Sequence, residues 1–182
     1  MILLWAVLIG LFIGFLRRGS LQNLGRLRLH GFWLILGALI IQILIFPLGP
    51  REPLVRWGTN YLHLLSYLLL MGFILLNRHY WEFLVMGAGL GLNLLVVAFN
   101  GGYMPASAAA LCYAGLEKVA TTLERGLHHG NTVLMTAKTK LNFLGDWLAL
   151  PAGVPLANAF SVGDLILALG VILLLARRMA RP

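Results

Sequence analysis

Residues 81–99 read WEFLVMGAGLGLNLLVVAF, and this stretch decides the fold class. Its one charged residue, Glu82, lies near the start, and its one amide side chain is Asn93. An α-helix rises 1.5 Å per residue, so about 20 apolar residues cross the roughly 30 Å hydrocarbon core of a bilayer. Residues 81–99 therefore predict a transmembrane helix.

The rest of the chain has the same apolar character. Of its 182 residues, 60% are hydrophobic and 11% are charged, whereas an average soluble domain has roughly 45–50% and about 25%. A soluble core of this size has no room for so much apolar surface. The net charge of +8 comes from Lys and Arg clustered between apolar runs, with no groove-reading motif beside them, so we expect no nucleic-acid partner. The chain is predicted to be one membrane domain over residues 1–182.

Four further apolar runs are long enough, or nearly so, to cross the bilayer. The predicted transmembrane helices cover residues 1–16, 32–48, 57–76, 81–99 and 160–176. The expected fold class is an all-α integral membrane bundle of five transmembrane helices. Arg clusters at 17–28 and 177–181 belong in the cytoplasm by the positive-inside rule. This places the N-terminus outside, the C-terminus in the cytoplasm and an extracytoplasmic segment over 100–158.

The extracytoplasmic segment 100–158 is too long to be a bare loop. Ser107 is positioned to cap a short helix over 108–114, and Gly115 would end it. Residues 132–135 and 140–144 flank a short polar turn, so we expect them to form a small hairpin. Apolar residues at helical spacing predict an amphipathic helix at the outer interface: Leu116, Val119, Ala120, Leu123 and Leu127.

Polar residues within the predicted spans gather near their outer ends. Asn60, His63 and Tyr67 are spaced i, i+3, i+7 and share one helical face, and Asn93 and Asn100 follow in the next span. Because polar groups are costly in hydrocarbon, this one-sided polarity predicts a pocket that opens outward. Interhelical hydrogen bonds are the structural alternative. The candidate ligand-binding residues are Asn60, His63, Tyr67, Asn93, Asn100, Gly101, Gly102 and Ser161.

Asp146 and Asp164 are the only aspartates in the chain, and they are the candidate catalytic residues. Two carboxyl groups close together cannot both ionise cheaply, so one can act as a base toward water while the other acts as an acid. That is the requirement of an aspartic hydrolase. The alternative for Asp164 is structural, because Ser161-Val162-Gly163-Asp164 has the pattern of a capping box.

The five histidines do not have the pattern of a metal or haem site. His30 and His79 are expected on the cytoplasmic side and His63 near the outside, so they cannot share one ligand. The chain has no Cys-x-x-Cys-His sequence and no paired intramembrane histidines. We therefore expect no metal and no cofactor.

Two resemblances add to this interpretation. The whole chain resembles an uncharacterised bacterial family of small polytopic membrane proteins that share Asn-Gly-Gly-x-Met-Pro after a span, here 100–105, and Phe-Ser-x-Gly-Asp before the last span, here 160–164. The C-terminal third resembles lipoprotein signal peptidases, whose two catalytic aspartates lie just under twenty residues apart. Here the spacing is eighteen, and Ser-Val-Gly-Asp stands where that family has Asn-x-Ala-Asp. Both resemblances imply a bacterial inner (plasma) membrane protein.

Two classes of function stay open. The first is an aspartate-dyad hydrolase at the outer leaflet, as the resemblance to signal peptidases implies, with a lipid-linked or membrane-peptide substrate. The second is a non-catalytic membrane subunit, or a lipid- or ligand-binding module, that docks a partner through its outer segment. Membrane lipids are expected partners in both classes, and a protein partner or a second copy of the chain is open in both.

Overall fold

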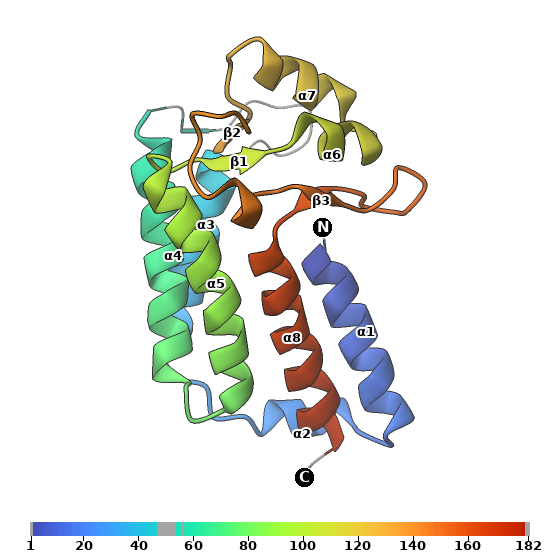
Figure 1. Cartoon of the computed structure of the whole chain (residues 1–182). Helices are drawn as coiled ribbons and strands as arrows, with labels where there is room; N and C mark the ends of the chain where they lie inside the picture. Colours follow the sequence, from blue (N-terminus) through green and yellow to red (C-terminus); the bar gives the residue numbers. More distant parts are fainter. Residues whose placement is uncertain (1, 47–53, 56, 181–182) are drawn as a thin grey trace.

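The computed structural model describes residues 2–46, 54–55 and 57–180, and most of them are helical. Five long helices run in alternating directions along one bundle, and a short helix, α2 (Leu21–Gly25), joins the first two of them (Figure 1). The segment between the last two long helices gathers at the end of the bundle where the N-terminus lies, whereas the C-terminus lies at the opposite end. The long helices are α1 (Ile2–Leu16), α3 (Phe32–Ile45), α4 (Thr59–Leu76), α5 (Trp81–Phe99) and α8 (Val162–Ala180).

Helices lie in all five regions where the sequence predicts membrane spans. By length and composition, α4 and α5 can cross a membrane, whereas α1 and α3 are shorter apolar helices. The last helix begins at Val162 instead of residue 160, because Ala159–Phe160 forms strand β4. Residues 1, 47 and 48 of the predicted spans lie outside the described residues.

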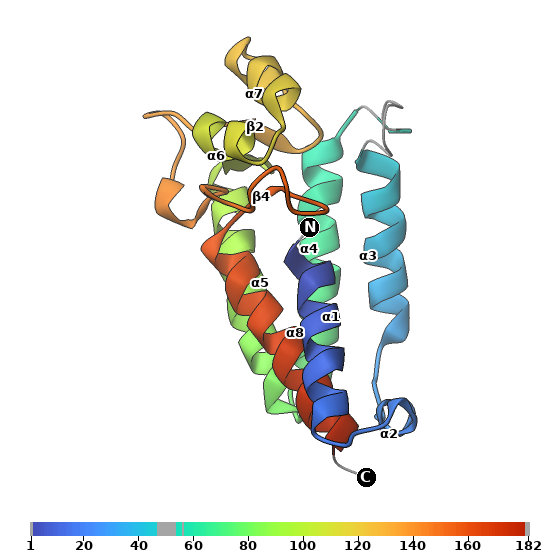
Figure 2. The same ribbon diagram turned by 90° about the vertical axis from the view of Figure 1, so that its right-hand side faces the viewer.

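The long helices pack in a row that does not close. α1 packs on α8, α8 on α5, α5 on α4 and α4 on α3. Among the described residues, no comparable packing joins α1 to α3, and Figure 2 shows α3 standing apart from α1. The bundle is therefore an open arc with an inner face between α1 and α3.

Glycines allow the closest helix contacts of the arc. A Cβ atom on Gly89 of α5 would collide with the backbone oxygen of Gly163 in α8, and a Cβ atom on Gly170 would lie 2.8 Å from the backbone nitrogen of Met86. Small residues of this kind let helix backbones approach each other in membranes. The α5–α8 contact therefore depends on Gly89, Gly163 and Gly170.

We expect Gly89→Ala to destabilise the protein by about 1–3 kcal/mol, the usual range for overpacking a tight contact. Gly91→Ala is the matched control, since its nearest neighbour is a flexible methyl group of Met71 at 3.7 Å. The same change there should leave stability unchanged or raise it, because alanine favours helix. Thermal unfolding in detergent measures both variants. Equal effects at the two positions would contradict this account of the α5–α8 contact.

The segment after α5 folds into a small cap on the bundle. It contains two short helices, α6 (Ala108–Tyr113) and α7 (Glu117–Glu124), the 3₁₀ helix η1 (Asn142–Leu144), and two-stranded pairings. Strand β1 (Met104–Ala106) pairs in parallel with β2 (Thr132–Leu134), and β3 (Leu148–Ala149) pairs antiparallel with β4 (Ala159–Phe160).

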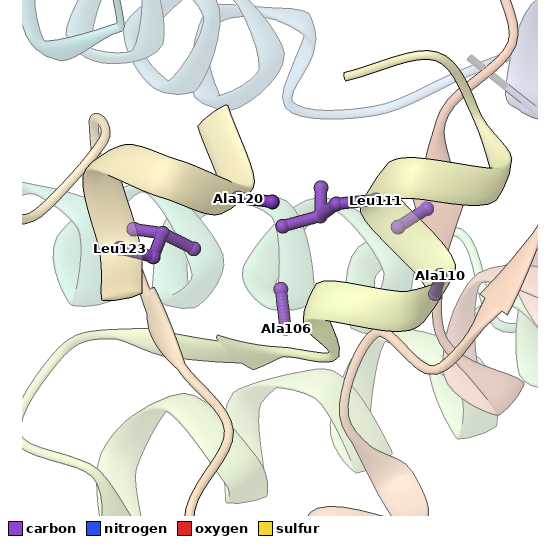
Figure 3. Packing of buried hydrophobic residues seen from close by; sticks show 6 residues of the cluster. Ala106, Ala110, Leu111, Ala120 and Leu123 are labelled. Carbon is purple, nitrogen blue, oxygen red and sulfur yellow. The ribbon is translucent and has the colours of Figure 1, made fainter. Parts of the chain in front are cut away.

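Both predicted helices of the cap are present, but the second ends at Glu124, so Leu127 of its predicted apolar face lies beyond the helix and is exposed. The Ser107 side chain accepts a hydrogen bond from the backbone of Ala110 at the start of α6, and Gly115 takes a positive φ of 74° just after it. Helix α7 buries Ala120 and Leu123 against α6 and β1, as Figure 3 shows. This small core holds α6 and α7 over the end of the helix bundle (Figure 1).

The predicted hairpin between 132–135 and 140–144 is wrong. Residues 132–134 pair with β1 instead, and residues 142–144 form η1. Residues 132–134 make their backbone hydrogen bonds with β1, which directly follows α5, instead of with residues 140–144. On this side, Met104 N donates to Asn131 O at 2.8 Å, and Met135 N donates to Ala106 O at 2.8 Å. Residues 136–142 are held in a turn by hydrogen bonds among Thr136, Thr139 and Asn142.

Candidate functional site

Asp164 belongs to a hydrogen-bonded cluster at the start of α8. Its backbone N donates to Ser161 Oγ at 2.9 Å, and Ser161 N donates to Asp164 Oδ2 at 3.2 Å. This reciprocal pair is the capping box that the sequence pattern suggested. Asn93 of α5 joins it, since Asn93 Nδ2 donates to Asp164 Oδ1 at 2.7 Å and Ser161 Oγ donates to Asn93 Oδ1 at 2.7 Å. Two donors therefore face the Asp164 carboxyl group.

Asp146 is held by its backbone and left free at its side chain. Its backbone N donates to Pro105 O at 2.9 Å, and its backbone O accepts from Ser107 N at 2.9 Å. These two hydrogen bonds hold Asp146 beside β1. Its carboxyl oxygen Oδ1 is buried and has no hydrogen-bond partner among the described residues. Burial, and then the charge of Asp164, raise the pKa of Asp146 to about 8. Asp146 is therefore suited to hold a proton at neutral pH.

The two aspartates line adjoining cavities under the cap. Asp146 lines a cavity of about 610 Å³ between the end of α3, α6 and α7. Asp164 lines a smaller cavity of about 130 Å³ beside the start of α1. Asn158 and Ala159 line both cavities, so the two cavities are neighbours. The two candidate catalytic residues therefore line neighbouring cavities.

The remaining predicted ligand-binding residues divide into two groups. Tyr67 packs against His63, with ring centroids 5.1 Å apart, and lies within range of the charges of both aspartates. The others join the turn after α5 to its neighbours. His63 Nδ1 lies 3.0 Å from Gly102 O, Asn60 Nδ2 donates to Gly101 O, and Asn100 exchanges two 2.8 Å hydrogen bonds with the backbone of Lys140.

This second group is therefore a clamp rather than part of the cavity wall. The described residues that line the two aspartate cavities do not include Asn60, His63, Asn100, Gly101 or Gly102. Gly102 has φ +96°, and a Cβ atom there would collide with Asn60. Interhelical and turn hydrogen bonds account for these polar residues.

Several polar residues that line the larger cavity are not among the candidate ligand-binding residues named from the sequence. Gln42, His129, Thr132 and Asn158 all border it. The signal for Gln42 was available, since it is a lone amide in the otherwise apolar run 32–48. His129 and Thr132 lie there only because β2 pairs with β1. Within the described residues, no group of three or more His, Cys, Asp or Glu side chains comes together to hold a metal ion.

A second polar cluster, also missed, lies at the opposite end of the bundle. Glu82 at the start of α5 is completely buried and contacts Arg178 at 2.7 Å and Arg177 at 3.5 Å, both near the end of α8. The two guanidinium groups also lie over aromatic rings, Arg177 over Trp81 and Arg178 over Tyr80. The sequence interpretation assigned these arginines to membrane orientation alone.

Comparison with known proteins identifies one family. The model of DUF5317, described as a family of unknown function, matches residues 26–176. No curated protein and no solved structure matches the chain. The expected relationship to a family of unknown function is confirmed, whereas the resemblance to lipoprotein signal peptidases stays a prediction.

Proposed function

The chain belongs to DUF5317, a family of unknown function, and we propose from its own geometry that it is a membrane hydrolase in which Asp146 and Asp164 act as an acid and a base. One observation carries the proposal. Asp146 presents a buried carboxyl oxygen, without a hydrogen-bond partner among the described residues, at a large cavity next to the cavity of Asp164. A buried polar group without a partner is costly, and such groups are concentrated at functional sites.

A membrane location is supported by what the helices expose. Large apolar side chains stand out from the long helices, among them Phe12, Trp33, Ile40, Leu68 and Leu84, each more than half exposed. Apolar surface on this scale marks a membrane or partner contact. We propose that all five long helices cross the inner membrane, with the cap and N-terminus outside and the Arg-bearing end in the cytoplasm.

This topology predicts opposite accessibility for two thiols. Cys112, the single cysteine, is exposed in the cap. In right-side-out spheroplasts, a membrane-impermeant maleimide should label Cys112 in the wild-type protein. In a Cys112→Ala background, the Arg26→Cys variant should be labelled only after the membrane is permeabilised, because Arg26 is exposed near α2 at the other end of the bundle. Labelling of the Arg26→Cys variant in sealed spheroplasts would refute the topology.

The proposed reaction is hydrolysis of an ester or amide. Hydrogen bonds from Asn93 and Ser161 stabilise the ionised form of Asp164 better than any contact stabilises an ionised Asp146. Asp164 then takes a proton from water as the water oxygen attacks the carbonyl carbon, and Asp146 gives its proton to the carbonyl oxygen. When the tetrahedral intermediate breaks down, Asp164 passes its proton to the leaving group and Asp146 recovers its own.

The test is hydrolysis by purified protein in lipid nanodiscs. Two probes are used, a quenched fluorescent acyl ester and a quenched lipopeptide, because the proposed substrates are lipid-linked molecules or membrane peptides. Wild-type protein should release dye from at least one probe, and Asp146→Asn should release none. The proposal fails if neither probe is cleaved faster than in protein-free nanodiscs, or if Asp146→Asn matches the wild type.

A second candidate is a non-catalytic module that binds a lipid or docks a protein. It is favoured by the cap, where the aromatic side chains of Tyr113 and Phe143 are more than half exposed. Under this alternative, Asp164 serves as the capping residue of α8 and Asp146 only lines a binding cavity. The non-catalytic module would be favoured if the wild-type protein hydrolysed neither probe and the Asp146→Asn variant still bound them.

A further inference from the structure

A third cavity extends the aspartate site into the helix bundle. Its volume is about 230 Å³, and its lining is entirely Leu, Ile, Phe and Met side chains from the long helices. Leu3 of α1 lines both this cavity and the cavity of Asp164, so the two adjoin. Polar and apolar spaces therefore follow one another from Asp146, through Asp164, into the bundle.

The apolar cavity is lined by residues of both helices that end the arc, α1 and α3. On α5 it reaches from Leu90 back to Phe83, and a helix covers about 10 Å in that many residues. Its lining includes Leu3 of α1 and Ile35 of α3, the two helices that no close packing joins among the described residues. In a bilayer, lipid hydrocarbon would face the apolar cavity between α1 and α3.

The charges around the site indicate what kind of head group fits. No Lys or Arg side chain is among the described residues that line the three cavities, while both aspartates border them. A phosphate or carboxylate head would lie beside both aspartates with no Lys or Arg side chain in the lining to balance it, which is unfavourable at low dielectric. An uncharged ester or amide carbonyl meets the proton of Asp146 without this repulsion.

We infer that the site takes a single-chain acyl lipid with an uncharged ester or amide head. Its hydrocarbon chain enters between α1 and α3 and lies in the apolar cavity, and its carbonyl group lies between Asp146 and Asp164. This inference rests on the proposed function, since it names the substrate class of the same two aspartates. It excludes an unlipidated membrane peptide as the preferred substrate.

The experiment is photo-crosslinking of wild-type protein in nanodiscs to a monoacylglycerol with a diazirine in its chain. Adducts mapped by mass spectrometry are expected on cavity residues such as Leu70 and Leu90. Ile35→Trp should reduce this labelling about tenfold, because exclusion of two methylene groups is enough for that loss. Ile40→Trp is the matched control on the same helix, since Ile40 is 57% exposed and outside the cavity lining, and it should label like the wild type.

A lysophosphatidic acid probe with the same chain tests the head group. It should label the cavity residues at least several-fold less than the monoacylglycerol does, and equal labelling would overturn the assignment of an uncharged head. If wild-type adducts were confined to exposed residues such as Ile40, the lipid's hydrocarbon chain would not lie in the apolar cavity, and the inference would be wrong. This outcome needs only the wild-type protein, so it holds even if Ile35→Trp fails to fold. If the wild-type protein formed cavity adducts but hydrolysed neither probe, the lipid site would stand and the hydrolase proposal would be wrong.

Discussion

Replacing either aspartate with asparagine is expected to lower hydrolysis by several orders of magnitude while the protein stays folded. Asparagine has the size of aspartate and keeps some hydrogen bonds, but it cannot exchange a proton with water or with a carbonyl oxygen. Residues that act as a unit give losses that do not add, so the double variant should be no worse than the worse single variant. The measurement is the initial rate of probe cleavage in nanodiscs.

Glu124→Gln is the control for this experiment. Glu124 lies on the exposed side of α7 in the same cap, so removal of its charge should leave the rate unchanged. If Glu124→Gln lowered the cleavage rate as much as the two aspartate variants do, the loss would reflect the removal of negative charge and not a catalytic role of the aspartates. A loss in Asp164→Asn alone would leave Asp146 without a catalytic role and contradict the dyad.

Stability separates the two aspartates in a second way. The pKa of Asp146 rises from 3.8 to about 8 on folding, so between these values the folded protein holds a proton that the unfolded chain has lost. Stability should therefore fall as pH rises from about 4 to about 8 and level off above, with a slope of at most about 1.4 kcal/mol per pH unit from this one proton. Asp146→Asn should remove this slope in thermal unfolding measured across that range. A slope that survives in Asp146→Asn would assign it to another group.

Asp164→Asn should instead lower stability by about 1 kcal/mol, because it weakens the cap of α8. Asparagine keeps an oxygen that can accept from Ser161 N or Asn93, so the loss is modest. The fall should appear at every pH at which Asp164 is ionised. The catalytic effect of this variant is therefore much larger than its effect on folding.

The second large effect is expected at the opposite end of the bundle. Glu82→Gln should destabilise the protein by about 2–3 kcal/mol, less than removing one partner from a fully buried ion pair, because the side chains of Arg177 and Arg178 are 33% and 19% exposed. Glu82 is completely buried, and the Nε atoms of Arg177 and Arg178 are already buried without hydrogen-bond partners among the described residues. Loss of the carboxylate would leave two guanidinium groups without a counter-charge.

Thermal unfolding in detergent measures this effect, with Glu117→Gln as control. Glu117 is also an acid in the first turn of a helix, but it is exposed and has no ion pair among the described residues. A triple variant with leucine at 82, 177 and 178 should recover most of the lost stability, since apolar replacements of a buried ion pair are often neutral. A Glu82→Gln protein as stable as Glu117→Gln would show that the pair contributes little.

Local sequence determined where the long helices lie. Apolar runs of 18 and 19 residues can satisfy their backbone hydrogen bonds internally, so the positions of α4 and α5 follow from the run itself. Caps are also local, since the capping box at Ser161 and Asp164 involves groups three residues apart. The amphipathic pattern of α7 likewise identified its buried face, through Ala120 and Leu123.

Only the tertiary structure decided which segments meet. Strand β2 pairs with β1 instead of its neighbour in sequence, and Glu82 meets Arg178 across 96 residues. The same long-range packing separates the clamp at Asn60, His63 and Asn100 from the cavities of the aspartates. The physical reason is that periodicity shows which face of an element is apolar, but not which other element will cover it. That choice depends on packing between distant segments, as at Gly89 and Gly163, where two helices come close enough to place Asn93 against Asp164.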